Sequence, residues 1–450
     1  MRTKLLNIWE SIRISFWFIP GLMGIGAIAL AFLLVWVDQT EEIEKKYLSF
    51  LLTNVGTESA RAILSTIASS MITVAGTVFS ITIVALTLAS SQFGPRLLRT
   101  FMKDRRNQFV LGTFIATFIY CLLVLQSVHS FDDQTFVPRL SISFAALLTL
   151  LSASVLIYFI HHISISIQAD QVIAAVYRDL EQNLKRLFPE ELGKGANQND
   201  GEDLLAEKEI SNYSLSCKIK APNTGYLQAI EGERLIKLAE SKDFFIRIHY
   251  RPRHYITKGS PLAEFHSNFE LTEELKKSIL ECFIVGAQRS PEQDTEFAIH
   301  QLVEIALRGL SPSINDPYTA MVCVDRLGSA LAYLADRAFP SKLRLSDGGK
   351  IRVEANAETF EGITNAAFNQ IRQHGQLDVA VQIRLLETLK VIMDLTTSPK
   401  RMKALTAQAE LIHDSVSTNL SGSDLADALA RYKACMAAAK SQKAAKIALV

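Results

Sequence analysis

Charged and apolar residues are distributed unevenly along this chain of 450 residues. Its first third holds four segments without Asp, Glu, Lys or Arg, whereas charged residues recur every few positions from Gln168 onward. A helix needs about 20 apolar residues to cross ~30 Å of hydrocarbon. The pattern therefore predicts a transmembrane domain over residues 1–165, with helices at about 14–37, 62–91, 109–128 and 140–162.

The charges between these segments predict an orientation. Basic residues precede the first segment and fill the loop after the second, and the other two loops are acidic. The basic residues are Arg2, Lys4, Arg13, Arg96, Arg99, Lys103, Arg105 and Arg106. Because cytoplasmic loops carry an excess of Lys and Arg, we expect both termini to be cytoplasmic.

The second segment carries hydroxyl residues at alternating steps of four and three, interrupted only by Val84. The series consists of Thr66, Ser70, Thr73, Thr77, Ser80, Thr87 and Ser91. This spacing places them along one stripe of a helix. Two interpretations stay open: small hydroxyl residues let helices pack closely, or the stripe lines a water-filled pathway. The absence of charged residues within the spans argues against an ion-coupled pump.

The remainder of the chain predicts a mainly α fold with one small β module. We expect a helical stalk at 166–189, a linker at 190–213, a small β-barrel-like module at 214–266 and an α-helical cytosolic domain at 267–450. Ser290 and Pro291 are typical of a helix start, as are Asp316 and Pro317. Alternating apolar residues, beginning at Leu215, support the β module.

Candidate chemistry is sparse. The residues that stand out in the helical domain are Asp294, His300, Glu304, Asn315 and Asp316. His300 and Glu304 are one turn apart and could bind a metal, but ordinary ion pairs between neighbouring turns explain them better. We find no phosphate-binding loop, metalloprotease motif or nucleophile elbow. The sequence predicts no enzymatic activity, metal or cofactor.

Net charge and cysteine usage exclude further classes of protein. The formal net charge of +1 leaves no basic excess for nucleic acid. The five cysteines are scattered, without metal-ligand spacing, which is typical of free thiols in a reducing compartment.

Several segments together resemble a known family. They include Ser91-Gln92-Phe93-Gly94-Pro95-Arg96 and Ser311-Pro312-Ser313-Ile314-Asn315-Asp316-Pro317. In order and spacing they are similar to the bacterial predicted-membrane-protein family catalogued as domain of unknown function 2254. The resemblance implies a protein of the bacterial inner membrane and no particular activity.

Two functional hypotheses follow. In the first, the chain forms a homo-oligomer in the lipid bilayer, the second helix lines a channel-like pathway for ions or small solutes, and the cytosolic part regulates it. In the second, the chain is a non-conducting membrane-anchored scaffold or sensor whose cytosolic domain binds a partner or metabolite.

Overall fold

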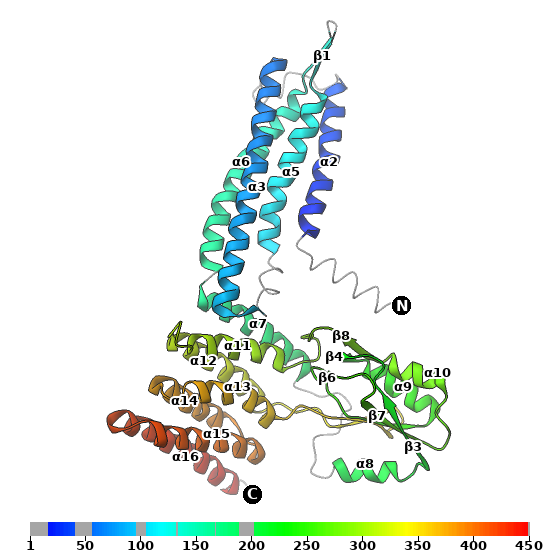
Figure 1. The fold of residues 1–450 in the computed structure, drawn as a ribbon, viewed down its shortest axis with the longest axis vertical. Helices are drawn as coiled ribbons and strands as arrows, with labels where there is room; N and C mark the ends of the chain where they lie inside the picture. Colours follow the sequence, from blue (N-terminus) through cyan, green and yellow to red (C-terminus); the bar gives the residue numbers. More distant parts are fainter. Residues whose placement is uncertain are drawn as a thin grey trace. The chain divides into compact units, whose positions relative to one another are not determined.

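The computed structural model describes residues 17–40, 56–95, 105–131, 134–166, 168–188 and 202–448. The chain separates into two compact units, which we call the N-terminal unit (Met1–Val172) and the C-terminal unit (Ile173–Val450). Figure 1 labels the helices and strands of both.

The described residues of the N-terminal unit include four helices long and apolar enough to cross a membrane, as the sequence predicts. They are α2 (Phe18–Gln39), α3 (Thr57–Phe93), α5 (Arg105–Ser127) and α6 (Arg139–Ser166). A two-stranded antiparallel hairpin of β1 (His129–Phe131) and β2 (Gln134–Phe136) joins the last two helices. With 37 residues, α3 is about 55 Å long and exceeds the ~30 Å of a hydrocarbon core. Most of the basic residues behind the predicted orientation lie outside the described residues; Arg105 and Arg106 begin α5.

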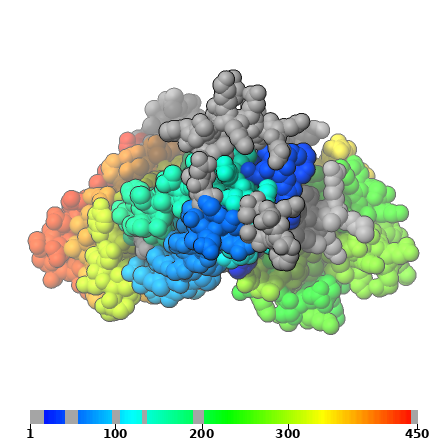
Figure 2. Space-filling model, turned by 90° about the horizontal axis from the view of Figure 1, so that it is seen from above, coloured from blue at the N-terminus to red at the C-terminus, as the bar shows by residue number. Residues whose placement is uncertain are grey.

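Helix α5 packs against the other three helices of this unit. In the end-on view of Figure 2, its cyan atoms lie between those of α2 (dark blue) and α6 (blue-green). Small residues permit this closeness: a Cβ atom added to Gly112 of α5 would lie 3.2 Å from the Cα of Pro20 in α2. Polar contacts secure the ends of the helices. The carboxylate of Asp38 accepts from the backbone N–H groups of Leu140 (3.0 Å) and Ser141 (2.9 Å), which caps α6.

A separate amphipathic helix, α7 (Ala169–Leu187), occupies the predicted stalk. Its side chains reach the helical part of the C-terminal unit. Arg326 lies over the ring of Tyr177 at 5.3 Å. Directly after the helix, the ring of Phe188 lies 4.9 Å from that of Phe339.

Six helices form the helical part of the C-terminal unit. They are α11 (Glu296–Gly309), α12 (Pro317–Leu334), α13 (Phe360–His374), α14 (Val379–Leu395), α15 (Pro399–Asn419) and α16 (Gly422–Ala448). Each packs on its neighbours, α12 between α11 and α14, and α15 against α13 and α16. The mainly α fold predicted from the sequence is confirmed.

The predicted small β-barrel is wrong, because the described strands of the C-terminal unit form two open sheets. One has the order β3-β7-β5-β10-β9 and the other β6-β4-β8. The strands are β3 (Leu215–Lys220), β4 (Gly225–Ile230), β5 (Phe245–Ile248), β6 (Tyr255–Ile256), β7 (Pro261–Ser267), β8 (Phe283–Gly286), β9 (Leu343–Leu345) and β10 (Ile351–Ala355).

The predicted barrel does not form because strands such as β8 and β10 come from outside the segment that was predicted to form it. β10 comes from the region predicted to be helical and pairs in parallel with β5, with Val353 opposite Ile246. β8 also lies beyond residue 266 and pairs with β4. A barrel closes only when its own edge strands pair with each other, and here strands from outside the predicted module take the pairing positions.

Helices cover both faces of the larger sheet. Ile246 and Ile248 of β5 share a buried core with α9 (Gly232–Lys242) and α10 (Glu273–Leu280). Phe245 points to the opposite face, where it packs with Ala206. Ala206 belongs to α8 (Glu202–Ile210), which lies within the predicted linker.

Candidate functional site

The hydroxyl residues predicted to share a helix face lie on the outer face of α3, and all seven are exposed in the protomer. We call Thr66, Ser70, Thr73, Thr77, Ser80, Thr87 and Ser91 the hydroxyl stripe. Each follows a buried residue of α3 by two positions, as Thr73 follows Met71. Because two residues turn a helix by about 200°, the stripe points away from the face that packs on α5.

Most of these hydroxyl groups are satisfied within their own helix. Thr66 donates to the carbonyl of Ala62 (2.7 Å), and Thr73 donates to that of Ser69 (2.8 Å). Thr77, Ser80 and Thr87 make the same bond to the carbonyl four residues earlier, at 2.9 to 3.1 Å. This bonding lowers the cost of placing the groups in an apolar environment. Each oxygen keeps acceptor capacity for a water or a cation.

Asp294 lies in a loop and not in the helix that the sequence predicted to begin at Pro291. Helix α11 starts at Glu296. The loop is held to the β module because Gln293 exchanges two hydrogen bonds with the backbone of Ile230, at 3.0 and 3.1 Å. It folds back so that Arg289 donates to the buried carboxylate of Asp294 (2.8 Å from Nε). Burial raises the pKa of Asp294, and the Arg289 guanidinium opposes this shift.

His300 and Glu304 do not interact as a metal-binding pair. The Nε2 atom of His300 lies 3.3 Å from Glu296, and Glu304 lies 3.7 Å from Arg308. Glu296 also pairs with Arg253, which follows β5 and has a positive φ of 92°. Within the described residues, no group of three His, Cys, Asp or Glu side chains could hold a metal ion.

Asn315 and Asp316 form the turn between α11 and α12. Asn315 adopts a left-handed conformation (φ 51°), which asparagine tolerates better than most residues. Asp316 accepts from the N–H (3.1 Å) and the hydroxyl (2.6 Å) of Thr319, which confirms the predicted cap with Pro317 in the first turn. These two residues are therefore structural within the protomer.

The structure joins Asp294 to Arg289, and it joins His300 through Glu296 to Arg253. The sequence did not single out these partners. Arg251 and Arg253 follow β5, and Glu358 follows β10. Arg251 lies 3.2 Å from Glu358, and Arg253 pairs with Glu296. Arg251 and Arg253 are only two residues apart, and this spacing is the signal by which the sequence could have singled them out. The sequence could not show their acidic partners, because these come from distant segments.

Four apolar helices followed by a large unit of helices and open sheets define an integral membrane protein of mainly helical fold. The chain belongs to the family described as predicted membrane protein, domain of unknown function 2254, whose model matches residues 13–391. The resemblance seen in the sequence is therefore confirmed. Uncharacterised proteins of Mycobacterium bovis and Mycobacterium tuberculosis are each 32% identical over 358 residues, which cover 78% of this chain and 67% of the relative. No solved structure matches the chain.

Proposed function

We propose that copies of this chain assemble in the bacterial inner membrane through the outer face of α3, and that the hydroxyl stripe lines a channel-like pathway for ions or small solutes. The observation that carries the proposal is the position of the stripe opposite the α5 contact. In this assembly both termini and the C-terminal unit are cytoplasmic, and that unit regulates the pathway. The proposal gives the chain no catalytic role.

The composition of the outer face favours this assembly over contact with lipid alone. The other helices present large apolar side chains, such as Leu150 on α6, which is 69% exposed. Between Thr66 and Ser80, α3 exposes Ile72 and Phe79, but most of its exposed residues there carry hydroxyl groups. They are joined by Gly76, beside which an added Cβ would meet nothing within 4 Å. Small residues allow helices of neighbouring subunits to approach closely, and hydroxyl oxygens can replace part of the hydration shell of an ion.

Flux through liposomes that contain the purified chain tests conduction. We expect Thr73→Leu and Thr77→Leu each to reduce the flux of monovalent ions by on the order of tenfold, because each replaces an acceptor by a larger apolar group. Ser154→Leu is the matched control, since Ser154 is an exposed residue of α6 whose hydroxyl donates to the Leu150 carbonyl (3.2 Å). An absence of flux in the wild type, or equal effects of all three substitutions, would refute the pathway.

A scaffold or sensor is the second candidate, and the internal bonding of the hydroxyl groups favours it. Because hydroxyl groups such as those of Thr73 and Thr77 already donate to their own helix, most of the stripe can be buried in a dry contact between subunits without unpaired donors. This candidate predicts assembly through α3 without flux. The scaffold or sensor is supported, and the channel is excluded, if subunits cross-link through α3 while liposomes that contain the chain stay impermeable.

A further inference from the structure

A cavity of about 400 Å³ lies within the C-terminal unit, at the carboxyl ends of β5 and β10. These two strands form the parallel pair of the larger sheet, and ligands of open α/β sheets commonly bind beyond the carboxyl ends of such strands. The cavity is mostly apolar. Its apolar walls include Leu187, Ile230, Leu235, Ile236, Ile248 and Val353.

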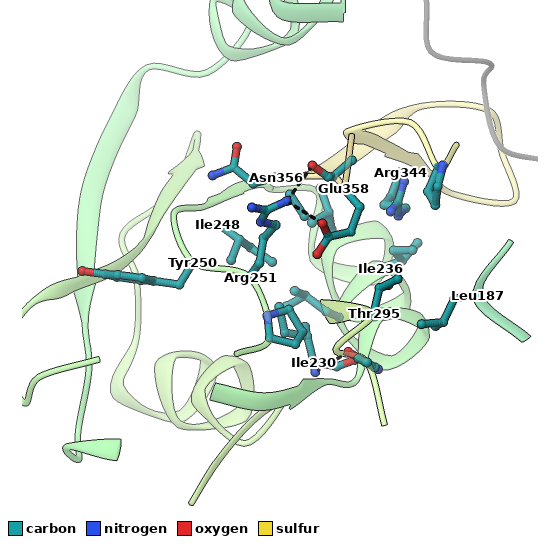
Figure 3. Close-up of a pocket in the computed structure, with 18 of the residues that line it drawn as sticks. Leu187, Ile230, Ile236, Ile248, Tyr250, Arg251, Thr295, Arg344, Asn356 and Glu358 are labelled. Carbon is teal, nitrogen blue, oxygen red and sulfur yellow. Dashed lines mark hydrogen bonds and ion pairs between the residues drawn. The ribbon is translucent and has the colours of Figure 1, made fainter. Parts of the chain in front are cut away.

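Two arginines line the cavity, and within the described residues only one of them has a carboxylate partner. Arg251 donates to the carbonyl of Ala357 (3.0 Å) and lies 3.2 Å from the carboxylate of Glu358. In the view of Figure 3, this pair and Arg344 lie on one side of the cavity, opposite Ile230 and Leu187.

Arg344 uses a single nitrogen in its contacts with the described part of the chain. Its Nη1 donates to the carbonyls of Ser341 and Leu343. No carboxylate of the described residues lies within 4.0 Å of its guanidinium, and its Nε and Nη2 groups have no protein acceptor there. Burial lowers the pKa of Arg344, and Glu202 offsets this shift only in part. The Nε–Nη2 edge of a guanidinium is the edge that binds carboxylate or phosphate through two parallel hydrogen bonds.

We infer that this cavity binds a small organic anion, in which a carboxylate or phosphate group meets the free edge of Arg344 and an apolar body fills the space against Ile236 and Leu187. The volume agrees with such a ligand, since pockets for small molecules span about 300–1,000 Å³ and are mainly apolar with few polar groups. The site is distinct from the hydroxyl stripe and does not depend on conduction.

The carboxylates that line the cavity do not prevent an anion from binding at Arg344. Glu358 is already paired with Arg251. Glu233, in the first turn of α9, is exposed, so water and salt screen its charge from a ligand at Arg344. Gly232 also lines the cavity, and a Cβ added there would meet nothing within 4 Å. The space beside Gly232 is therefore unobstructed.

Calorimetric titration of the detergent-purified full chain tests the inference with three probes of one shape. 2-Naphthoate and 2-naphthyl phosphate carry the anion, 2-naphthamide is neutral, and empty detergent micelles provide the baseline. We expect at least one anion to bind more tightly than the amide. Replacement of Arg344 by Met should weaken that anion about 10- to 100-fold, as loss of a charge-assisted hydrogen bond does. Arg344→Lys should give a smaller loss, because the charge remains without the two-pronged edge.

Two further variants separate this site from general effects. Ile236→Trp should abolish binding because it fills the cavity. Arg384→Met should leave binding unchanged, because Arg384 is half-buried and pairs with Asp325 outside the cavity. Thermal unfolding of each variant confirms that it is folded. The inference is overturned if neither anion binds better than the amide, if folded Arg344→Met and Arg344→Lys bind like the wild type, or if Ile236→Trp still binds.

Discussion

Gly328 lies at a close contact between α12 and α14. It is buried in the middle of α12, and a Cβ atom added there would lie 2.1 Å from the Cγ2 methyl group of Thr388. Glycine is unfavourable inside a helix by about 1 kcal/mol relative to alanine. Glycine at this position lowers the helix propensity of α12, but it allows the two helices to pack closely.

Substitution of this glycine tests the contact. Gly328→Ala should destabilise the protein by about 1–3 kcal/mol, because the methyl group overpacks the interface. Adding Thr388→Ser removes the opposing methyl group and should restore most of the loss. Thermal unfolding of the single and double variants measures both effects. Equal stabilities of Gly328→Ala and the double variant would contradict the predicted clash.

His254 is a second residue with its own prediction, because its surroundings make the stability of the folded state depend on pH. Its Nδ1 atom accepts a hydrogen bond from the backbone N–H of Arg251 (3.2 Å). Burial lowers the pKa of His254, Arg253 and Arg251 lower it further, and Asp294 opposes them. Protonation would therefore both break this hydrogen bond and place a third cation beside two guanidinium groups.

The sign of the pH effect follows from this shift. As pH falls below about 6.5, the unfolded chain binds a proton at His254 before the folded chain does. The folded state should therefore lose stability in acid, and His254→Gln should flatten that loss. Unfolding temperatures at pH 7.5 and 5.5 measure it, with His374→Gln in an exposed position as the control. A wild type and His254→Gln with the same pH dependence would disprove this role.

At the scale of elements, α3 combines an inner face rich in alanine with an outer face on which hydroxyl residues lie among apolar ones. Ala68 and Ala75 are among the buried residues of the inner face. Helix α6 differs, because large apolar residues such as Leu147 and Leu150 dominate its exposed surface. Two helices of similar hydropathy thus present different chemistry to their surroundings.

Disulfide cross-linking in membranes tests whether this difference directs assembly. Thr73→Cys on α3 should give a cross-linked dimer under mild oxidation, because neighbouring subunits meet at this face in the proposed assembly. Ser154→Cys on α6 should remain monomeric. The native cysteines contribute little background, since four are buried and Cys217 is half-buried. Cross-linking of both variants, or of neither, argues against assembly through α3.

At the scale of the whole molecule, the C-terminal unit folds through contacts between distant segments. Arg247 of β5 binds Glu354 of β10 (2.5 Å) and Glu207 of α8 (2.7 Å). Phe245 shares a buried cluster with Leu343 of β9. The β module therefore depends on strands that follow two helices later in the chain.

Truncation tests this dependence. A fragment of residues 173–290 should be less ordered than a fragment of residues 173–450, because β5 loses its partner β10 and Phe245 becomes exposed. Amide proton dispersion in NMR spectra and resistance to proteolysis compare the two. A shorter fragment as well ordered as the longer one would show that the β module folds alone.

Local patterns in the sequence determined the four apolar helices, the spacing of the hydroxyl stripe and the Asp316 cap. Helix length, helix periodicity and N-terminal capping depend on residues within a few positions of one another, so the order of residues suffices to predict them.

Only the tertiary structure decided which side of α3 faces outward, that β10 joins β5 in an open sheet, and that Arg344 lines a mostly apolar cavity. Each of these depends on segments that are far apart in the chain, such as α9 and β9. Their approach is selected by burial and by pairing across the whole unit, which local periodicity does not encode.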